Sequence, residues 1–319
     1  MAQCDVEHAL PAHIGDYTDF FTSWHHMVNA GRVFRPDAPP LPAFKWLPMG
    51  YHGRASTVQL SGTPVRRPCG QTAGPGAAPS YGPSAALDHE LELAVWIGPG
   101  NRQGEPIPLD RAEPQVFGLG LLNDWSARDL QAWEALPLGP FLAKNFQTSV
   151  SPWIVTLAAL EPFRCALPRA PGDPPWLGPR HDPAAPEPSG FDLQLEALLQ
   201  TAAGGTREFR LSSSSFRHCH WSLAHLVAHH TAGGCALRPG DLFGTGTQSG
   251  PGVGEQGCLL ELTEGGRRPL TLPDGTQRRY LEDGDTVVLR AWAERAGAAR
   301  IGFGECRGTV LPAARPAGG

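Results

Sequence analysis

Residues 88–97 read "DHELELAVWI", and this stretch has the pattern of a β-strand. Side chains alternate between the two faces of a strand, so Glu90 and Glu92 point to one face with Asp88, while Leu91 points to the other. Carboxylates this close repel each other. Two explanations remain open: the acidic side chains form a solvated outer face, or they hold a cation with ligands from elsewhere in the chain.

Strand-like runs of the same kind recur along the sequence. The 33 prolines and 39 glycines are spread throughout, which disfavours long helices and favours short strands joined by turns. The predicted strands cover residues 57–60, 91–97, 116–122, 151–157, 191–199, 207–213, 258–263, 285–293 and 308–312. The predicted helices cover residues 17–31, 124–135 and 222–234. The first helix is expected to begin at Asp16 or Thr18 and to end at Gly31.

The composition is that of a soluble globular protein of 319 residues, long enough for one large domain or two ordinary ones. The net charge of −5 offers no basic surface for nucleic acid. No apolar run has the length of a membrane span, and the N-terminus lacks the features of a signal peptide. We therefore expect a cytoplasmic protein that acts on a small molecule, without nucleic-acid or membrane partners.

The proline-rich segment 168–189 is predicted to be a surface loop within one domain spanning residues 1–319. A linker between two domains is the alternative; strand signals resume directly after the segment, which favours the loop. The seven cysteines, of which Cys4 is the first, are scattered and form no C-x-x-C pair. This argues against a disulfide framework or a four-cysteine zinc site and predicts small buried residues.

Two further segments combine acidic residues with possible partners. Asp124 follows an apolar strand and begins a helical pattern, so Arg128 and Gln131 are expected to lie with it on one helix face. An N-cap with a surface partner would give the same local pattern. Asp19 and His26 are seven residues apart on the first predicted helix, where they could equally be structural.

Together, four carboxylates would form an all-oxygen cage. This ligand set suits a hard cation such as Ca²⁺ or Mg²⁺ rather than zinc. The four residues are Asp19, Glu90, Glu92 and Asp124. Lys144 and Thr148 lie four residues apart between apolar neighbours and could flank such a site, although an exposed lysine is the simpler interpretation of Lys144.

A competing metal site is suggested by His225 and His229, which have the i, i+4 spacing of zinc ligands on a helix. The segment lacks the glutamate of an H-E-x-x-H motif, and histidines near a helix C-terminus are favourable without any metal. The glycine-rich residues 244–254 match neither a Walker loop nor a dinucleotide fingerprint. They predict a tight turn that lines a pocket.

Several motifs carry a family resemblance: "DYTDFF", "GYHGRAS", "ELELAVWIGPGNRQGEPIP", "LLNDWSARDLQAWE", "PLGPFLAKNFQTSVSPW", "LRPGDLFGTGTQSGP" and "RIGFGECRGTVLPA". In this order, from about Ile14 onward, the sequence closely resembles the catalytic domain of the fumarylacetoacetate hydrolase family. The resemblance implies a β-rich α+β fold, a mixed roll of β-sheets with few helices, and a homodimer. The family's small N-terminal domain is expected to be absent, either in a shortened natural variant or because the gene model begins too late.

The resemblance also implies roles for individual residues. The metal-binding carboxylates are Asp19, Glu90, Glu92 and Asp124, with Lys144 and Thr148 beside the metal. The catalytic base is His26, and Glu261 orients it. Arg128, Gln131 and Lys144 surround the substrate's reacting oxygens and leaving group, and Arg35, Tyr51 and Thr247 are further substrate contacts. Phe21 and Ala135 stand where the family has two substrate-contacting tyrosines, which leaves the exact substrate open.

The implied reaction is metal-dependent hydrolysis of a carbon–carbon bond. Fumarylacetoacetate would be cleaved to fumarate and acetoacetate, the last step of tyrosine and phenylalanine breakdown. Bound Ca²⁺ or Mg²⁺ would polarise a substrate carbonyl, while His26, held by Glu261, deprotonates the attacking water. Two alternatives remain: acylpyruvate hydrolysis, or decarboxylation, hydration or isomerisation of a related 2-oxo acid, on the same metal scaffold; or an inactive binding protein left by truncation.

Overall fold

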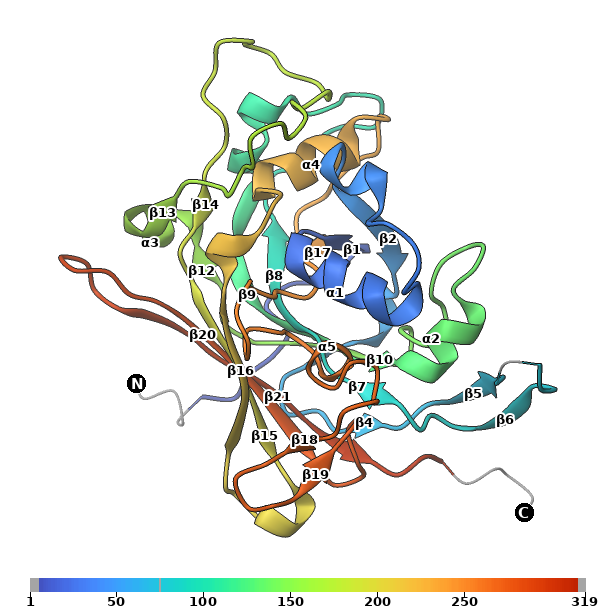
Figure 1. The fold of residues 1–319 in the computed structure, drawn as a ribbon. Helices are drawn as coiled ribbons and strands as arrows, with labels where there is room; N and C mark the ends of the chain where they lie inside the picture. The colour runs from blue at the N-terminus through green and yellow to red at the C-terminus, as the bar shows by residue number, and fades with distance from the viewer. Residues whose placement is uncertain (1–5, 75, 315–319) are drawn as a thin grey trace.

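Strand β8 (Leu91–Ile97) lies near the middle of a mixed eight-stranded sheet in the computed structural model, which describes residues 6–74 and 76–314 (Figure 1). The order across this sheet is β2 (Met49–Gly53), β1 (Tyr17–Phe21), β17 (Leu242–Gly244), β8, β9 (Val116–Asp124), β11 (Thr148–Val150) and β3 (Val58–Leu60), and β12 (Val155–Thr156) also pairs with β9. The β1–β17 and β11–β3 pairs are parallel, whereas the other pairs are antiparallel.

A second sheet of five strands packs against the first and extends away from it as a long twisted ribbon (Figure 1). Its order is β16 (Phe209–Ser215), β15 (Gln194–Gln200), β20 (Thr286–Ala293), β21 (Ile301–Leu311) and β4 (Val65–Arg66). Four two-stranded pairs complete the strands: β5 (Cys69–Thr72) with β6 (Ser80–Pro83), β7 (Leu87–Asp88) with β10 (Ser126–Ala127), β13 (Arg164–Cys165) with β14 (Gly190–Phe191), and β18 (Leu270–Thr271) with β19 (Gln277–Arg278). The predicted β-rich α+β fold with mixed sheets is confirmed.

The α-helices are short: α1 (Trp24–Phe34), α2 (Arg128–Glu134), α3 (Leu157–Leu160), α4 (Leu223–Thr231) and α5 (Leu259–Leu262). Side chains of α1 and α4 share one apolar core with both sheets, including Met27, Leu226, Leu93 and Leu289. The other face of β8 is also covered, since Ala94 and Trp96 belong to a second cluster. Every residue of β8 is buried, so the solvated outer face considered for its acidic residues is wrong.

The first predicted helix is partly wrong. Residues 17–21 form strand β1, held between β2 and β17, and the helix begins only after the N-cap Ser23, whose Oγ accepts a hydrogen bond from the His26 amide. The segment is rich in aromatic side chains, which suit a pleated surface. Asp19 and His26 therefore do not share a helix face. Neither Asp16 nor Thr18 is the N-cap.

Other boundaries also differ from the prediction, and the strand predicted at residues 308–312 begins seven residues earlier, as β21. Residues 258–263, predicted as a strand, contain helix α5, because an apolar run this short does not distinguish the two states. Asp124 is the last residue of β9, and α2 begins only at Arg128, so these two do not share a helix. Of residues 151–157, only Val155–Thr156 form a strand. The predicted helix at 222–234 is confirmed as α4, with Ser222 as its N-cap.

The proline-rich segment leaves the fold and returns at one hairpin-like base. Residues 166–189 contain neither helix nor strand, and they connect β13 to β14, which pair with each other. Of the cysteines, Cys219, Cys258 and Cys306 are buried as predicted, Cys235 is exposed, and Cys4 lies outside the described residues. Within residues 6–74 and 76–314, the helices are all too short or too polar to cross a bilayer.

Candidate active site

A cavity of about 300 Å³ opens between β1, β2, α1 and α2. Its walls bring together most of the residues that the sequence selected. They include Asp19, Phe21, His26, Arg35, Tyr51, Glu90, Arg128, Gln131, Lys144 and Thr247. Gly246 and Thr247 of the glycine-rich segment form part of the wall, as predicted, but the turn of this segment lies at residues 253–254, outside the lining.

The four predicted carboxylates meet beside this cavity, and Asp19 and Glu90 belong to its lining. Asp19 lies in β1, Glu90 directly precedes β8, Glu92 lies in β8, and Asp124 ends β9. One oxygen of each lies within 4.8 Å of the other three. Strand β17 separates β1 from β8, and its Gly244 leaves room for the cluster: a Cβ there would collide with Asp19 Oδ1 and lie 2.9 Å from Glu92 Oε2.

The electrostatics of the cluster fit a bound cation. Burial, together with the neighbouring Asp124, raises the pKa of Asp19 well above its ordinary value, and burial together with Asp19 does the same to the pKa of Glu92. Asp19 Oδ1 and Glu92 Oε1 are buried and have no hydrogen-bond partner among the described residues. Unpaired buried carboxylate oxygens are costly, and a hard divalent cation would satisfy both of them.

Glu90 has a different environment from its three neighbours. Its Oε1 accepts a hydrogen bond from Arg128 Nη1 at 2.7 Å, and its Oε2 accepts one from Lys144 Nζ at 2.7 Å. Burial alone would raise the pKa of Glu90, but Lys144 and Arg128 hold it well below its ordinary value. Glu90 therefore stays ionised and links the carboxylate cluster to the two cations of the cavity wall.

Three donors converge on Asp124. Its carboxylate accepts hydrogen bonds from Lys144 Nζ at 2.6 Å, Tyr51 OH at 2.9 Å and Thr148 Oγ1 at 3.1 Å. Thr148 stands opposite Asp124 in the β9–β11 register, which explains its approach. Lys144 is only 7% exposed, so the simpler interpretation of an exposed surface lysine is wrong.

His26 and Glu261 form a buried pair on another side of the cavity. The Nδ1 atom of His26 lies 2.7 Å from Glu261 Oε2. Glu261 also accepts hydrogen bonds from Asn29 Nδ2 at 2.9 Å and from Ser249 Oγ at 2.8 Å. Burial would raise the pKa of Glu261, but His26 and these donors keep it below its ordinary value. An ionised glutamate thus holds the imidazole in one orientation.

Of the remaining predicted substrate contacts, Phe21 and Thr247 line the cavity, whereas Ala135 does not. Phe21 lines the cavity, with its ring centroid 5.1 Å from that of His26, and Thr247 Oγ1 is buried without a hydrogen-bond partner in the described chain. Arg128 Nη2 is likewise buried and unpaired there, so both atoms keep an unused capacity for a hydrogen bond. Ala135 is the C-cap of α2 and does not belong to the lining of the cavity in the described chain.

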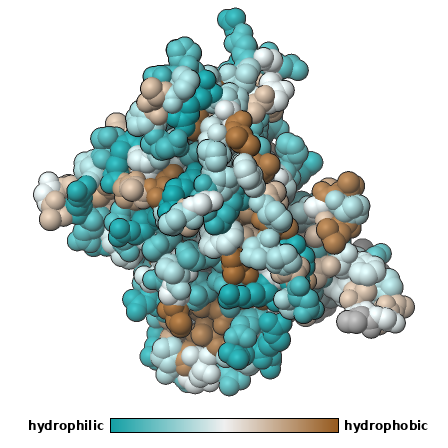
Figure 2. Space-filling model, turned by 45° about the horizontal axis from the view of Figure 1, so that its top comes forward, coloured by the Kyte–Doolittle hydropathy of each residue, from teal (hydrophilic) through white to brown (hydrophobic). Residues whose placement is uncertain are grey.

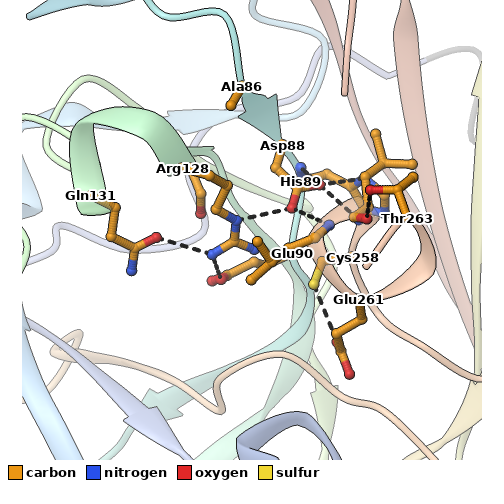
Figure 3. Close-up of polar contacts among 12 residues, drawn as sticks. Ala86, Asp88, His89, Glu90, Arg128, Gln131, Cys258, Glu261 and Thr263 are labelled. Carbon is orange, nitrogen blue, oxygen red and sulfur yellow. Dashed lines mark hydrogen bonds and ion pairs between the residues drawn. The ribbon is translucent and has the colours of Figure 1, made fainter. Parts of the chain in front are cut away.

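Several residues of the site were not selected from the sequence. Asp88 contacts Arg128 (Figure 3), Asn29 and Ser249 contact Glu261, and the Gly246 amide donates to Glu92 Oε2 at 2.9 Å. Asp88 carried a signal, because the strand pattern placed it on the face of Glu90. The others are common residue types in unremarkable local sequence, and only long-range contacts make them part of the site.

The two histidines of helix α4 that suggested a competing zinc site lie apart from the clusters of potential metal ligands. Within the described residues, the clusters of potential ligand atoms are the four carboxylates and the group His26, Cys258 and Glu261, and neither contains His225 or His229. Burial is the main reason that the pKa of His225 falls to about 3, and its ring packs against Trp176 and Trp221. His225 is thus a neutral core residue.

Comparisons with known proteins agree with this geometry. The family profile described as "Fumarylacetoacetate (FAA) hydrolase C-terminal" matches residues 17–311. The fumarylacetoacetase of Oryza sativa subsp. japonica is 48% identical over 312 residues, covering 97% of this chain and 71% of the rice protein. The fumarylacetoacetase of Homo sapiens is 46% identical over 321 residues, covering 99% of this chain and 74% of the human protein.

Solved structures share the fold at lower identity. The 5-carboxymethyl-2-hydroxymuconate delta-isomerase from Mycobacterium smegmatis has a TM-score of 0.55 at 19% identity, covering 98% of this chain and 85% of that one. The fumarylpyruvate hydrolase from Pseudomonas aeruginosa, in complex with Mn²⁺ and pyruvate, has a TM-score of 0.51 at 19% identity, covering 94% and 90%. From the profile match and the identities above, this chain belongs to the fumarylacetoacetate hydrolase family.

Proposed function

We propose that this protein is a fumarylacetoacetase, a hydrolase that cleaves a carbon–carbon bond of fumarylacetoacetate to give fumarate and acetoacetate. The observation that carries the proposal is the meeting of two devices in one cavity: the His26–Glu261 pair and the four-carboxylate cluster. The named relatives at 46–48% identity support this substrate. Tyrosine and phenylalanine breakdown would then be the pathway of the reaction.

His26 serves as the general base. Because Nδ1 is hydrogen-bonded to the ionised Glu261, its proton belongs on that nitrogen, and Nε2 is the basic atom that accepts a proton from water. Glu261 holds the ring in place and stabilises the imidazolium that forms. The proton held at Nε2 is then available to the departing carbanion, so one residue serves both half-steps.

Arg128, Lys144 and Gln131 stabilise the negative charge that develops as the bond breaks. Arg128 and Lys144 are buried, charged and pre-oriented by Glu90, so they need no rearrangement during the reaction. Arg128 Nη2 has no partner in the described chain, and we propose that it donates to a substrate oxygen. Gln131 is fixed by its contact of 3.2 Å with Arg128 Nη1.

The carboxylate cluster is the proposed cation site. Asp19, Glu90, Glu92 and Asp124 would hold the ion, which supplies Lewis-acid polarisation of a substrate carbonyl when bound. We propose Ca²⁺ or Mg²⁺, because an all-oxygen set suits hard cations. The Mn²⁺ named for the Pseudomonas aeruginosa structure is the third ion to compare, as it favours the same ligands.

The test is the loss of fumarylacetoacetate absorbance with purified protein. We expect turnover to vanish after chelation and to return when Ca²⁺, Mg²⁺ or Mn²⁺ is added back. His26→Ala is expected to lose activity by about 10²- to 10⁴-fold, the usual contribution of a general base, and to keep its affinity for the cation. No turnover by the wild-type protein with any of these ions would overturn the proposed substrate.

A related acylpyruvate or other 2-oxo acid is the second candidate substrate, and Phe21 is the observation that favours it. Its ring packs against the catalytic His26 and brings no hydroxyl to the cavity wall. A site without that donor discriminates less against ligands that lack the matching acceptor. Comparing kcat/KM for fumarylacetoacetate and an acylpyruvate in the wild type and in Phe21→Tyr decides between them: tyrosine should favour fumarylacetoacetate.

We also propose a single cytoplasmic catalytic domain that forms a homodimer. One apolar core connects both sheets, which supports the single domain, and the described cysteines carry free thiols, as in a reducing compartment. Hydrophobic residues gather on the side of the molecule that carries α2 (Figure 2). Leu136, Leu138 and Phe141, which follow α2, are exposed, and so are the aromatic residues Trp133 of α2 and Tyr81 of β6. Light scattering of wild type and Leu138→Asp tests this surface; a wild-type monomer would contradict it.

A further inference from the structure

Asp88 is a buried carboxylate outside the cavity wall that uses both of its oxygens. It is 0% exposed. Oδ1 accepts hydrogen bonds from the amides of His89 and Leu259, both at 2.8 Å. Oδ2 accepts them from Arg128 Nε and from the Leu260 amide, both at 2.9 Å. Figure 3 shows Asp88 between Arg128 on one side and the segment that carries Cys258 and Glu261 on the other.

On the Arg128 side, Asp88 fixes the start of helix α2. Asp88 in β7 stands opposite Ser126 of β10, and β10 leads directly into Arg128. The guanidinium is then held at Nε by Asp88 and at Nη1 by Glu90, so its plane has little freedom to rotate. The same two contacts leave the unpaired Nη2 as the free donor.

On the other side, Asp88 caps the short helix α5. This helix has only four residues, and in the described structure its N-cap residue, Cys258, provides no side-chain cap. The first amides of a helix need acceptors, and Asp88 supplies them to Leu259 and Leu260 from a distant strand. Glu261 follows directly, so the cap fixes the residue that orients His26.

We propose that Asp88 is a positioning residue that fixes the position and orientation of Arg128 relative to the His26–Glu261 pair. The proposal rests on the function proposed above, in which these groups act on one substrate. Both connections from Asp88 are short and buried. One is a single hydrogen bond to Arg128, and the other consists of hydrogen bonds to two amides of α5, the residues directly before Glu261. The charge-stabilising donor and the general base thus share one support that never contacts the substrate.

Asp88→Asn tests this role, with Asp285→Asn as a matched control. An asparagine keeps the size but turns an NH₂ group toward a donor, which leaves that donor unpaired. Asp285 is also 0% exposed, accepts from Arg278 Nε at 2.8 Å and from the Glu282 amide at 2.9 Å, and lies outside the cavity wall. Both variants therefore lose a comparable buried arginine–aspartate pair, but only one of them supports the site.

The first readout is the low-field proton resonance of His26 Nδ1, assigned by its loss in His26→Ala and recorded without substrate. We expect it to shift or broaden in Asp88→Asn and to stay in place in Asp285→Asn. The second readout is kcat per folded enzyme, which should fall about 10- to 100-fold in Asp88→Asn with a smaller change in KM. An unchanged resonance and kcat in folded Asp88→Asn, or equal losses in both variants, would leave Asp88 a purely structural residue and overturn the proposal.

Arg128→Lys provides the test if Asp88→Asn does not fold. Lysine keeps the positive charge but removes the Nε contact with Asp88, so the His26 resonance should shift although Arg128 does not hydrogen-bond to His26 or Glu261. Gln131→Leu removes a different contact of the same guanidinium and should leave the resonance in place. An unmoved resonance in Arg128→Lys overturns the proposal. Since the resonance needs no turnover, failure of the proposed substrate is seen separately.

Discussion

Glu92 shows how a single residue carries information that its local sequence leaves open. In the sequence it is one acidic side chain on an alternating strand. In the structure it is buried, its Oε2 accepts from the Gly246 amide, and its Oε1 has no partner in the described chain. A buried carboxylate oxygen without a partner lowers the stability of the protein without ligand, and a bound cation would offset this cost.

At this scale we expect Glu92→Gln to weaken cation binding by more than about 100-fold, since loss of an outer-shell partner alone costs about 10–100-fold. Titration calorimetry with Ca²⁺, Mg²⁺ and Mn²⁺ measures the effect. Glu196→Gln, on strand β15 of the second sheet, is the control and should bind as the wild type does. Equal affinity in the wild type and Glu92→Gln would remove Glu92 from the site.

Glu261 provides a prediction of pH dependence. Burial opposes its ionisation, but His26, Asn29 and Ser249 bring the pKa of Glu261 below its ordinary value. Its folded pKa is thus lower than its unfolded pKa, so its contribution to stability is complete above about pH 4.3 and is lost as the pH falls through the folded pKa. The stability contributed by Glu261 therefore increases with pH through this range, as expected for a carboxylate whose ionised form is stabilised by its partners.

Glu261→Gln should therefore lower the free energy of unfolding at pH 7 by about 2 kcal/mol, the usual contribution of hydrogen bonds to a charged group. The difference from the wild type should narrow as the pH falls below about 4. Urea unfolding across this range measures it, with the exposed Glu294→Gln as the control. A difference that stays constant with pH would contradict the expected sign.

Among the elements, helix α1 connects local capping to catalysis. Ser23 Oγ accepts from the His26 amide at 3.2 Å and donates to the Ser249 carbonyl at 2.9 Å. Ser249 in turn contacts Glu261. The cap that starts the helix is thus also connected to the residues that hold the base.

We expect Ser23→Ala to cost about 1 kcal/mol of stability and also to reduce kcat, because the first turn carries His26. Ser222→Ala removes the buried N-cap of α4, which contacts His225 in the core rather than the cavity. It should cost a similar amount while kcat stays unchanged. Thermal unfolding measures the stability of both variants, and initial rates measure kcat. Equal kcat values in the two variants would contradict a contribution of the Ser23 cap to catalysis.

Other elements show where local patterns reach their limit. The predicted strand at 258–263 is instead helix α5, whose first amides are capped by Asp88 from a strand about 170 residues earlier. Likewise, Tyr17–Phe21 becomes a strand because β2 and β17 lie on both sides of it. In both cases, partners distant in sequence decide between two local conformations of similar energy.

For the whole molecule, the cation site exists only after folding. Its carboxylates come from β1, the residue before β8, β8 itself and the end of β9, so the unfolded chain has no comparable cluster. A ligand that binds only the folded state stabilises it by about 2.7 kcal/mol at a concentration 100 times its Kd.

Chelation should therefore lower the Tm by several degrees, and adding back the preferred cation should restore it. Scanning calorimetry with and without chelator measures the change. In Glu92→Gln the Tm should become nearly independent of the cation. A wild-type Tm that does not respond to any of the three ions would contradict a cation site in the folded protein.

The sequence by itself determined the fold class and the strand pattern of β8, and its family motifs selected ten residues that line the cavity. These depend on periodicity and on motifs that are contiguous in the chain. Only the tertiary structure decided that Asp19 lies on a strand, that Glu261 lies on a helix, and that Asp88 connects Arg128 to that helix. The physical reason is the same in each case: these states are set by hydrogen bonds and burial between segments far apart in sequence, which local propensity does not record.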